Sequence, residues 1–240
     1  MEVLLIAGLW LDTTAWDDVV PALAAKGHRG IPVALPGQGD GNADATLQDQ
    51  LDAVLEAIDA IDATDSAERP VVVGHSAACT LAWLAADARP DAIARVGLIG
   101  GFPSTAGEQY AAFSPLEGGV MAFPGWEPFA GADTADMSDD LKSRVAGSAH
   151  PVPGGVAEAV VAYRDERRHD VPVFLICPEF SPAQADEWIE AGDLPELADA
   201  KHLDLLDLDS GHWPMFTAPE ALAQLIADEA DEVSADAGLG

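Results

Sequence analysis

A chain of 240 residues with 42 acidic and 11 basic side chains carries a formal net charge of −31 at neutral pH. This charge repels phosphate backbones and anionic lipid surfaces, so neither nucleic acid nor membrane is an expected partner. No apolar run approaches the roughly 20 residues that a membrane helix needs, and the strand-like segment directly after Met1 leaves no room for a secretion signal, so a soluble, cytoplasmic protein is expected.

Short apolar runs alternate with longer amphipathic segments along the chain, which predicts an α/β fold with parallel strands joined by crossover helices. Strands are expected at residues 3–6, 30–34, 71–73, 96–99, 171–176 and 203–207, and helices at residues 15–26, 47–60, 77–88, 183–191 and 219–230. The length suits one domain with one large core.

Residues 101–170 do not follow this alternation of strands and helices. Six aromatic residues lie between positions 102 and 129, among many Gly and Pro. Long irregular segments in compact domains are usually either disordered or functional, and the aromatic content predicts a lid. The acidic, Ala-rich tail at residues 231–240 is expected to be flexible.

The strongest chemical signal is the sequence VVVGHSAA at residues 71–78, an apolar strand that enters a turn of small residues and then a helix. In a nucleophile elbow, such a turn holds a serine in strained backbone geometry and presents its hydroxyl above the sheet. Ala78 stands where the usual Gly-x-Ser-x-Gly pattern has its last Gly. Ser76 is therefore the predicted nucleophile, and the alternative is a serine that caps the following helix.

The second signal is the sequence LDLDSGHWP at residues 206–214, where the last expected strand ends in a loop that carries His212. A serine hydroxyl needs a base to take its proton, and histidine titrates near neutral pH. His212 is therefore the predicted base, with a purely structural histidine as the alternative. His75, beside the nucleophile, is expected to support the turn.

The loop after the first strand, with the sequence IAGLW at residues 6–10, is the third signal. Acyl transfer builds negative charge on the carbonyl oxygen, which two backbone N–H groups can stabilise, one after the nucleophile and one from this loop. The backbone N–H groups of Ala77 and Leu9 are the predicted oxyanion hole. Trp10 is expected either to wall the acyl pocket or to pack in the core.

Together these segments resemble the α/β-hydrolase superfamily over essentially the whole chain, and within it the branch of small esterases and hydroxynitrile lyases. The sequence GLWLDTTAW at residues 8–16 resembles the branch's Gly-x-Trp segment with a second Trp, and LPGQGD at residues 35–40 resembles its Leu-Pro-Gly-His-Gly loop. Ala7 departs from the relatives that carry His before the Gly. The resemblance implies a mostly parallel central sheet flanked by helices, a serine–histidine pair, and a lid insertion after the family's sixth strand, here residues 96–99. Residues 1–100 and 171–230 would then form the core and residues 101–170 the lid.

The resemblance also implies an acid in the loop ICPEFSP at residues 176–182, where Ser181 occupies the usual Asp position. Glu179 is the nearest carboxylate and is predicted to orient His212. Asp186 is the reserve, and a site without a carboxylate partner is the third possibility. Asp207 and Asp209 are assigned to a strand and a turn.

The predicted function is hydrolysis of a small, largely apolar carboxylic ester through an acyl-enzyme intermediate, by a carboxylesterase-like serine hydrolase that acts as a monomer or homodimer. Apolar pocket walls are expected from Trp10, Phe102, Phe123, Trp126 and Met215. The sequence has neither a Cys/His cluster with zinc-site spacing nor a Gly-rich nucleotide loop, so no metal and no cofactor are implied.

Two other functions remain open. The first is a C–C lyase similar to hydroxynitrile lyases, which usually place a Lys in the pocket, but Lys26, Lys142 and Lys201 lie in no obvious site loop. The second is a slow or non-catalytic ligand-binding homologue. The excess of Asp over Glu and the scarcity of Lys resemble the acidic proteomes of halophilic organisms, and the alternative is simply an acidic solubility surface.

Overall fold

A computed structural model describes residues 1–63, 69–111 and 113–237. Six strands of the described residues form one sheet in the order β2-β1-β3-β4-β7-β8, and every neighbouring pair is parallel. The strands are Glu2–Ile6 (β1), Arg29–Pro32 (β2), Val71–His75 (β3), Arg95–Ile99 (β4), Val173–Cys177 (β7) and Leu203–Asp207 (β8). The predicted α/β class with a mostly parallel sheet is confirmed.

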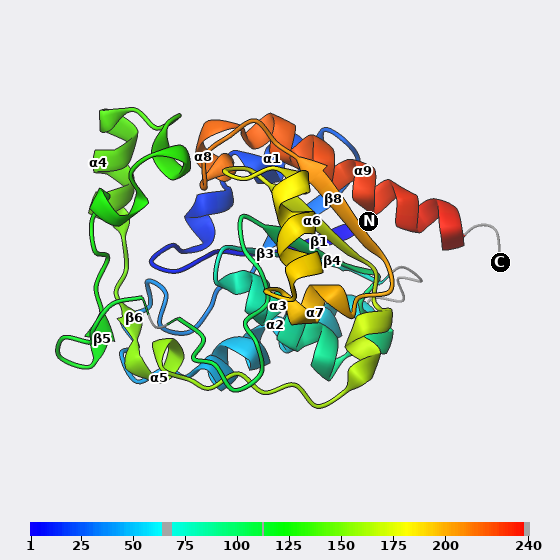
Figure 1. Cartoon of the computed structure of the whole chain (residues 1–240), viewed down its shortest axis with the longest axis horizontal. Coiled ribbons are helices and arrows are strands. Elements are labelled where there is room, and N and C mark those ends of the chain that lie inside the picture. The colour runs from blue at the N-terminus through cyan, green and yellow to red at the C-terminus, as the bar shows by residue number, and fades with distance from the viewer. Residues whose placement is uncertain (64–68, 112, 238–240) are drawn as a thin grey trace.

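Alternate residues of the strands build two cores, one on each face of the sheet. In β1, Leu4 and Ile6 pack against α2 and α3, whereas Val3 and Leu5 pack against α1 and α9. Figure 1 shows these two helical layers on opposite sides of the sheet. The helices are Val19–Ala24 (α1), Leu47–Asp62 (α2), Ala78–Ala88 (α3), Pro182–Ala191 (α6), Pro195–Ala198 (α7), Pro214–Thr217 (α8) and Pro219–Ala237 (α9).

Residues 101–170 lie between β4 and β7, so the strand that the resemblance equates with the family's sixth is the fourth strand of this chain. Short elements make up the segment: Val120–Met121 (β5), Glu127–Phe129 (η3), Ala132–Thr134 (η4), Asp139–Ser148 (α4), Val152–Pro153 (β6), Gly154–Ala157 (α5) and Glu166–Asp170 (η5). In Figure 1 the elements β5, β6 and α4 form a group beside the sheet. We refer to residues 101–170 as the inserted segment.

Two helices differ from the sequence expectation. The segment expected as one helix at residues 15–26 divides into a 3₁₀ turn, Thr13–Trp16 (η1), and α1, because Pro21 has no N–H with which to bond the carbonyl of Asp17. At the other end of the chain, α9 continues to Ala237, beyond the expected end at residue 230. Most of the expected flexible tail is therefore helical, which fits the high helix propensity of its alanines.

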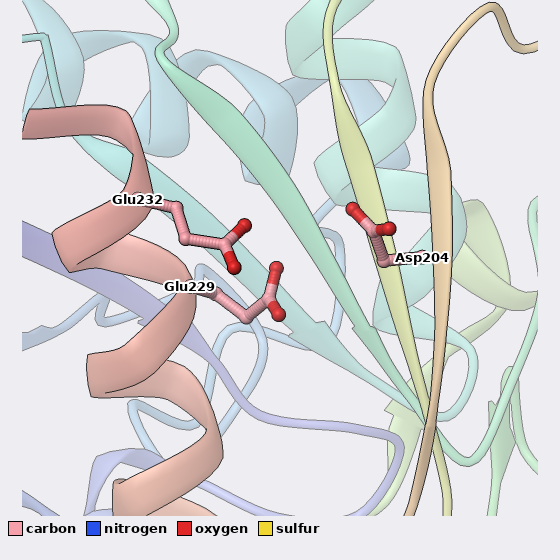
Figure 2. Close-up of side chains that lie close together, drawn as sticks. All are labelled: Asp204, Glu229 and Glu232. Carbon is pink, nitrogen blue, oxygen red and sulfur yellow. The ribbon is translucent and has the colours of Figure 1, made fainter. Parts of the chain in front are cut away.

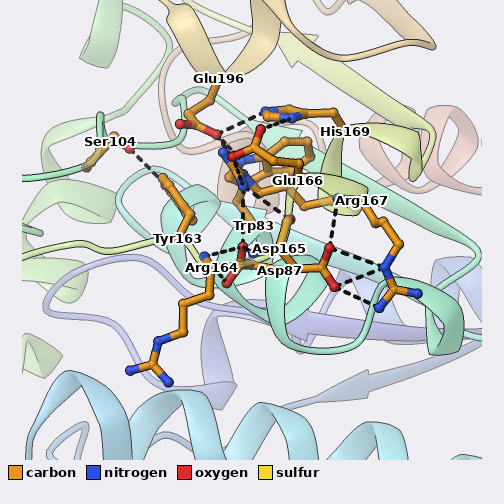
Figure 3. Close-up of polar contacts among 11 residues, drawn as sticks. Trp83, Asp87, Ser104, Tyr163, Arg164, Asp165, Glu166, Arg167, His169 and Glu196 are labelled. Atoms are coloured by element: carbon orange, nitrogen blue, oxygen red, sulfur yellow. Dashed lines mark hydrogen bonds and ion pairs between the residues drawn. The ribbon is translucent and has the colours of Figure 1, made fainter.

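The end of the inserted segment is fastened to α3 by buried charges (Figure 3). The carboxylate of Glu196 on α7 accepts hydrogen bonds from Trp83 Nε1 and from Arg168 Nε, both at 2.9 Å. Asp87, at the end of α3, accepts from the backbone N–H groups of residues 164 and 165. Separating the two parts would leave buried charges unpaired, which costs free energy. This network therefore holds the inserted segment against α3, the helix that follows Ser76.

A second charged cluster joins α9 to the sheet. Asp204, Glu229 and Glu232 converge (Figure 2), and their carboxylates lie within 4.8 Å of one another. The buried guanidinium of Arg95 pairs with all three, at 2.7 Å from Glu229 and 3.1 Å from Glu232. Burial raises the pKa of Glu229 to about 7, although Arg95 opposes the shift. Since Arg95 already supplies the positive charge, we interpret this cluster as a structural ion-pair network.

None of the described helices combines the length and the apolarity needed to cross a membrane.

Candidate active site

Ser76 lies in the turn between β3 and α3, at the carboxyl end of the sheet. Its φ of 57° is in the left-handed region, which a non-glycine residue adopts only at a cost. A Cβ at Gly74 would overlap the carbonyl of Ala78, so the small residues of the motif allow the chain to turn this tightly. The N-cap of α3 is Ala77, without a side-chain hydrogen bond, so the interpretation of Ser76 as a helix cap is wrong.

Ser76, His212 and Glu179 form a hydrogen-bonded chain. The Oγ of Ser76 lies 3.0 Å from Nε2 of His212, and Nδ1 of His212 lies 2.6 Å from Oε1 of Glu179. The side chains of His212 and Glu179 are only 13% and 14% exposed, so their hydrogen bond is shielded from water. Three residues from three separate loops are thereby brought together in the order that nucleophilic catalysis needs.

Of the candidate residues in this region, Glu179 is the one that contacts His212. Ser181 caps α6, with its side chain accepting from the N–H of Gln184 in a capping box, and Asp186 is exposed on that helix. A Cβ at Gly100 would lie 3.2 Å from both Glu179 Oε2 and His212 Nδ1, so a glycine there keeps room for the pair.

His75 has a different contact from the one expected. Its Nε2–H donates to the carbonyl oxygen of His212 at 2.7 Å, so it holds the second histidine as well as lying beside the turn. Burial lowers the pKa of His75 to about 3, and the nearby His212 adds to this shift. A neutral ring with its proton on Nε2 therefore supports the backbone of His212.

The inserted segment holds the same loop from the other side. The N–H of His212 donates to the carbonyl of Asp133, and the N–H of Gly211 donates to the carboxylate of Asp136, both at 2.8 Å. Sequence reasoning missed these two residues, because their partners are far away in the chain and no local motif marks them. His212 is thus clamped between β3 and the inserted segment.

The predicted oxyanion donors, Leu9 and Ala77, both border the pocket next to Ser76. Among the described residues, neither backbone N–H has a hydrogen-bond acceptor. Trp10 holds the loop in place: its φ is 64°, its carbonyl accepts from the N–H of His150 at 2.9 Å, and its indole donates to the carbonyl of Met121 at 3.2 Å. Both N–H groups are therefore free to bind an anionic oxygen.

A pocket of about 350 Å³ opens at Ser76. Trp10 and Phe102 line it as expected, and it also borders residues outside the expected set of five: Thr80, Ser104, Tyr110, Phe113, Phe129, Asp133 and Trp213. A second hollow of about 420 Å³ lies between α2, α3 and residues 155–164, and contains none of the hydrogen-bonded chain.

Three expected wall residues lie outside the lining. Phe123 and Trp126 lie behind the wall, with their ring centroids 5.0 Å apart, and contact Trp10 and Trp213 respectively edge to face. Met215 is fully buried in the core on the face of α1 and α9. From the sequence, an apolar residue that lines the pocket cannot be distinguished from one that packs behind the lining.

Residues 3–225 match the sequence pattern of the Alpha/beta hydrolase family. The chain belongs to this family. No curated protein sequence matches it.

Solved structures resemble this alpha/beta hydrolase over nearly its whole length. An extracellular alpha/beta-hydrolase from a Paenibacillus species, said to share structural and functional homology with tobacco salicylic acid binding protein 2, has a TM-score of 0.73 and 17% identity, with coverage of 95% of this chain and 98% of that one. A methylesterase from Arabidopsis has a TM-score of 0.71 and 16% identity, with coverage of 96% of this chain and 99% of that one. A pyrethroid hydrolase from Sphingobium faniae has a TM-score of 0.66 and 19% identity, with coverage of 96% of this chain and 97% of that one. At these identities the likeness establishes the fold.

Neither cysteine of this alpha/beta hydrolase has the properties of a nucleophile. Both thiols are free and buried. Burial raises the pKa of Cys79, and it raises the pKa of Cys177 to about 12. The thiolate is the reactive form of cysteine, so both side chains are inert near neutral pH.

The lysines of this alpha/beta hydrolase lie outside the pocket lining. Lys26 bonds to Gln224 on α9, and Lys201 pairs with Asp170. Lys142 lies on α4, where its carbonyl accepts from the indole of Trp126. Among the described residues that line the pocket, none offers an ammonium group of the kind that hydroxynitrile lyases usually offer to cyanide.

Proposed function

We propose that this alpha/beta hydrolase is a carboxylesterase that uses Ser76 as nucleophile, His212 as general base and Glu179 as the orienting acid. The observation that carries the proposal is the hydrogen-bonded chain from Glu179 through His212 to Ser76, which ends in a pocket beside two free backbone N–H groups. The names of two similar structures, a methylesterase and a pyrethroid hydrolase, agree with it.

In the proposed mechanism, His212 Nε2 takes the proton of Ser76 Oγ as the oxygen attacks the ester carbonyl. Negative charge builds on the carbonyl oxygen, and the N–H groups of Leu9 and Ala77 bind it. The imidazolium, stabilised by Glu179, then returns its proton to the leaving alcohol, which leaves an acyl group on Ser76. Water, activated by the same histidine, releases the acid and restores the serine.

The inserted segment acts as the lid in this proposal. It contributes Phe102, Phe113, Phe129 and Asp133 to the pocket, and it holds the His212 loop through the carbonyl of Asp133. A lid over the pocket lowers the local dielectric around the reacting carbonyl, which strengthens its interaction with the backbone N–H groups. At about 350 Å³, the pocket fits a small ester.

The test is steady-state hydrolysis of p-nitrophenyl acetate and butyrate by the wild type and by Ser76→Ala, in low and in molar salt. We expect turnover by the wild type and a loss of at least about 10³-fold in kcat in the variant. A fluorophosphonate should label Ser76 in the wild type and leave Ser76→Ala unlabelled. Absence of multiple turnover by folded wild type in both salts would contradict the proposal.

No observation favours the lyase alternative, because no lysine is among the described residues that line the pocket. A slow binding protein differs from an esterase in turnover alone, so the assay above separates the two.

A further inference from the structure

Asp133 is the charged group of the pocket that the proposed mechanism leaves without a role for its side chain. It lies in the 3₁₀ turn η4 of the inserted segment, half-buried, and it borders the same pocket as Ser76. Its backbone carbonyl holds His212, whereas its carboxylate has no hydrogen bond or ion pair to any other described residue. Its own backbone N–H is a hydrogen-bond donor to it, and a partly desolvated carboxylate without a positively charged partner costs free energy.

The Asp133 carboxylate has no positively charged partner among the described residues of the pocket. Burial raises the pKa of Asp133, with His212 opposing the shift and Glu179 reinforcing it. The pocket lining holds no Lys or Arg, and His75 is kept neutral by burial. Within the described pocket, no permanent positive charge balances the negative one.

Aromatic rings stand around the same space. Phe129 contacts Trp213 edge to face at 5.3 Å and Trp10 at 6.1 Å, and all three line the pocket. Phe129 is joined to the turn of Asp133, because its carbonyl accepts from the hydroxyl of Thr134. Aromatic faces attract cations, most strongly where water is excluded. An ammonium group would therefore meet both a carboxylate and aromatic rings in this pocket.

Building on the proposed esterase function, we propose that Asp133 is a specificity-determining residue, and that the substrate is an ester that carries an ammonium group, held between the Asp133 carboxylate and the aromatic walls. An ester with a carboxylate of its own would be repelled by Asp133. The net charge of −31 adds a long-range attraction for cations.

The test compares two inhibitors of the same size, choline and its uncharged analogue 3,3-dimethylbutan-1-ol, in the hydrolysis of p-nitrophenyl acetate. Competition measures binding in the pocket whichever part of the ester carries the charge. Assays in about 1 M NaCl, where the Debye length is about 3 Å, suppress attraction by the distant surface. The wild type should bind choline about tenfold more tightly than the alcohol, the effect of one charge-assisted contact.

In Asp133→Asn, which keeps the shape and the backbone carbonyl but removes the charge, we expect the ratio of the two inhibition constants to fall to about one, with the constant for the alcohol unchanged. The matched control is Asp140→Asn, which removes the same charge from an exposed site on α4. It should leave the ratio at its wild-type value.

A wild-type ratio near one, or a ratio that Asp133→Asn leaves unchanged, would overturn the inference while the esterase function stands. If p-nitrophenyl acetate is not turned over, the esterase function fails instead. Calorimetric titration of choline and of the alcohol into the same three proteins then decides the inference by the same ratio. Kinetics with acetylcholine and 3,3-dimethylbutyl acetate should show the same preference in kcat/KM, chiefly through KM.

Discussion

Glu179 contacts His212 from a position two residues before Ser181. We predict that Glu179→Gln lowers kcat by about 10³- to 10⁴-fold with little change in KM. The physical reason is the tautomer: a glutamine amide can donate to Nδ1 of His212, which moves the imidazole proton to Nε2, where it blocks acceptance of the Ser76 proton. The measurement is kcat for p-nitrophenyl butyrate.

Asp186→Asn is the matched control for that experiment, because Asp186 is an exposed carboxylate on the helix that follows Glu179. It should retain wild-type kcat. Equal losses in both variants, or loss in Asp186→Asn alone, would remove Glu179 from the proposed mechanism.

The buried, neutral state of His75 predicts a pH dependence of folding stability. Its pKa is about 3 in the folded protein and about 6.5 in an unfolded chain. Between these values the unfolded state binds the extra proton, so the free energy of unfolding decreases as the pH falls from about 6.5 towards 3, by up to about 1.4 kcal/mol per pH unit.

His75→Gln tests this assignment, since a glutamine amide can still donate to the carbonyl of His212 but does not titrate. Urea unfolding between pH 4.5 and 7.5 should show a shallower loss of stability in the variant than in the wild type. Glu229, whose pKa is raised to about 7, acts in the opposite direction over this range because the folded state then binds the extra proton. It does so in both proteins, so it cancels in the comparison. Identical slopes would contradict the role of His75.

At the site, the sequence was informative where a local motif sets the geometry. Ser76 and His212 were predicted from a strand-to-helix turn and a loop after the last strand, and the structure brings both together with Glu179. Asp133 and Trp213 were missed as pocket residues, because their places in the lining depend on how the inserted segment packs over the sheet.

The loop that carries Glu179 leads into α6, which begins at a capping box formed by Ser181 and Gln184. We predict that Ser181→Ala lowers the free energy of unfolding by about 1 kcal/mol, the usual value of an N-cap hydrogen bond. Because Ser181 has no contact with His212 in the hydrogen-bonded chain, kcat should remain within about twofold of the wild type. Urea unfolding and ester hydrolysis provide the two measurements.

Ser181→Asp is the matching variant, since Asp also caps helices well and favours the helix dipole. It should keep wild-type stability. A large loss of kcat in Ser181→Ala with unchanged stability would mean that Ser181 belongs to the site and not to the cap.

Helices and strands, like the site residues, were predictable where local sequence determines them and not where distant contacts do. The central strands β3 and β4 were expected to within two residues, because burial on both faces leaves a continuous apolar run. The short elements of the inserted segment were not expected, since pieces such as β5 and β6 have two residues each and exist only through their mutual pairing. Local propensity cannot specify elements of that length.

For the molecule as a whole, the net charge of −31 lowers stability through self-repulsion. Some of the few basic side chains relieve it locally, as Arg95 does among three carboxylates. We propose that the protein is adapted to high salt. Added NaCl should raise the unfolding temperature most steeply below about 1 M, because the Debye length falls from about 10 Å at 0.1 M to about 3 Å at 1 M.

Two substitutions at one exposed position separate this screening from a general salting effect. Glu56 lies on the outer face of α2, one helical turn after Asp52, so the two carboxylates repel each other. We predict that Glu56→Gln raises the unfolding temperature at 0.1 M NaCl, and that Glu56→Lys raises it further because Lys attracts Asp52. Differences between the three proteins should shrink towards 1 M NaCl, since screening removes the interaction that distinguishes them. If the differences persist undiminished at 1 M, charge repulsion is not what limits stability at low salt, and the acidic surface then serves solubility alone.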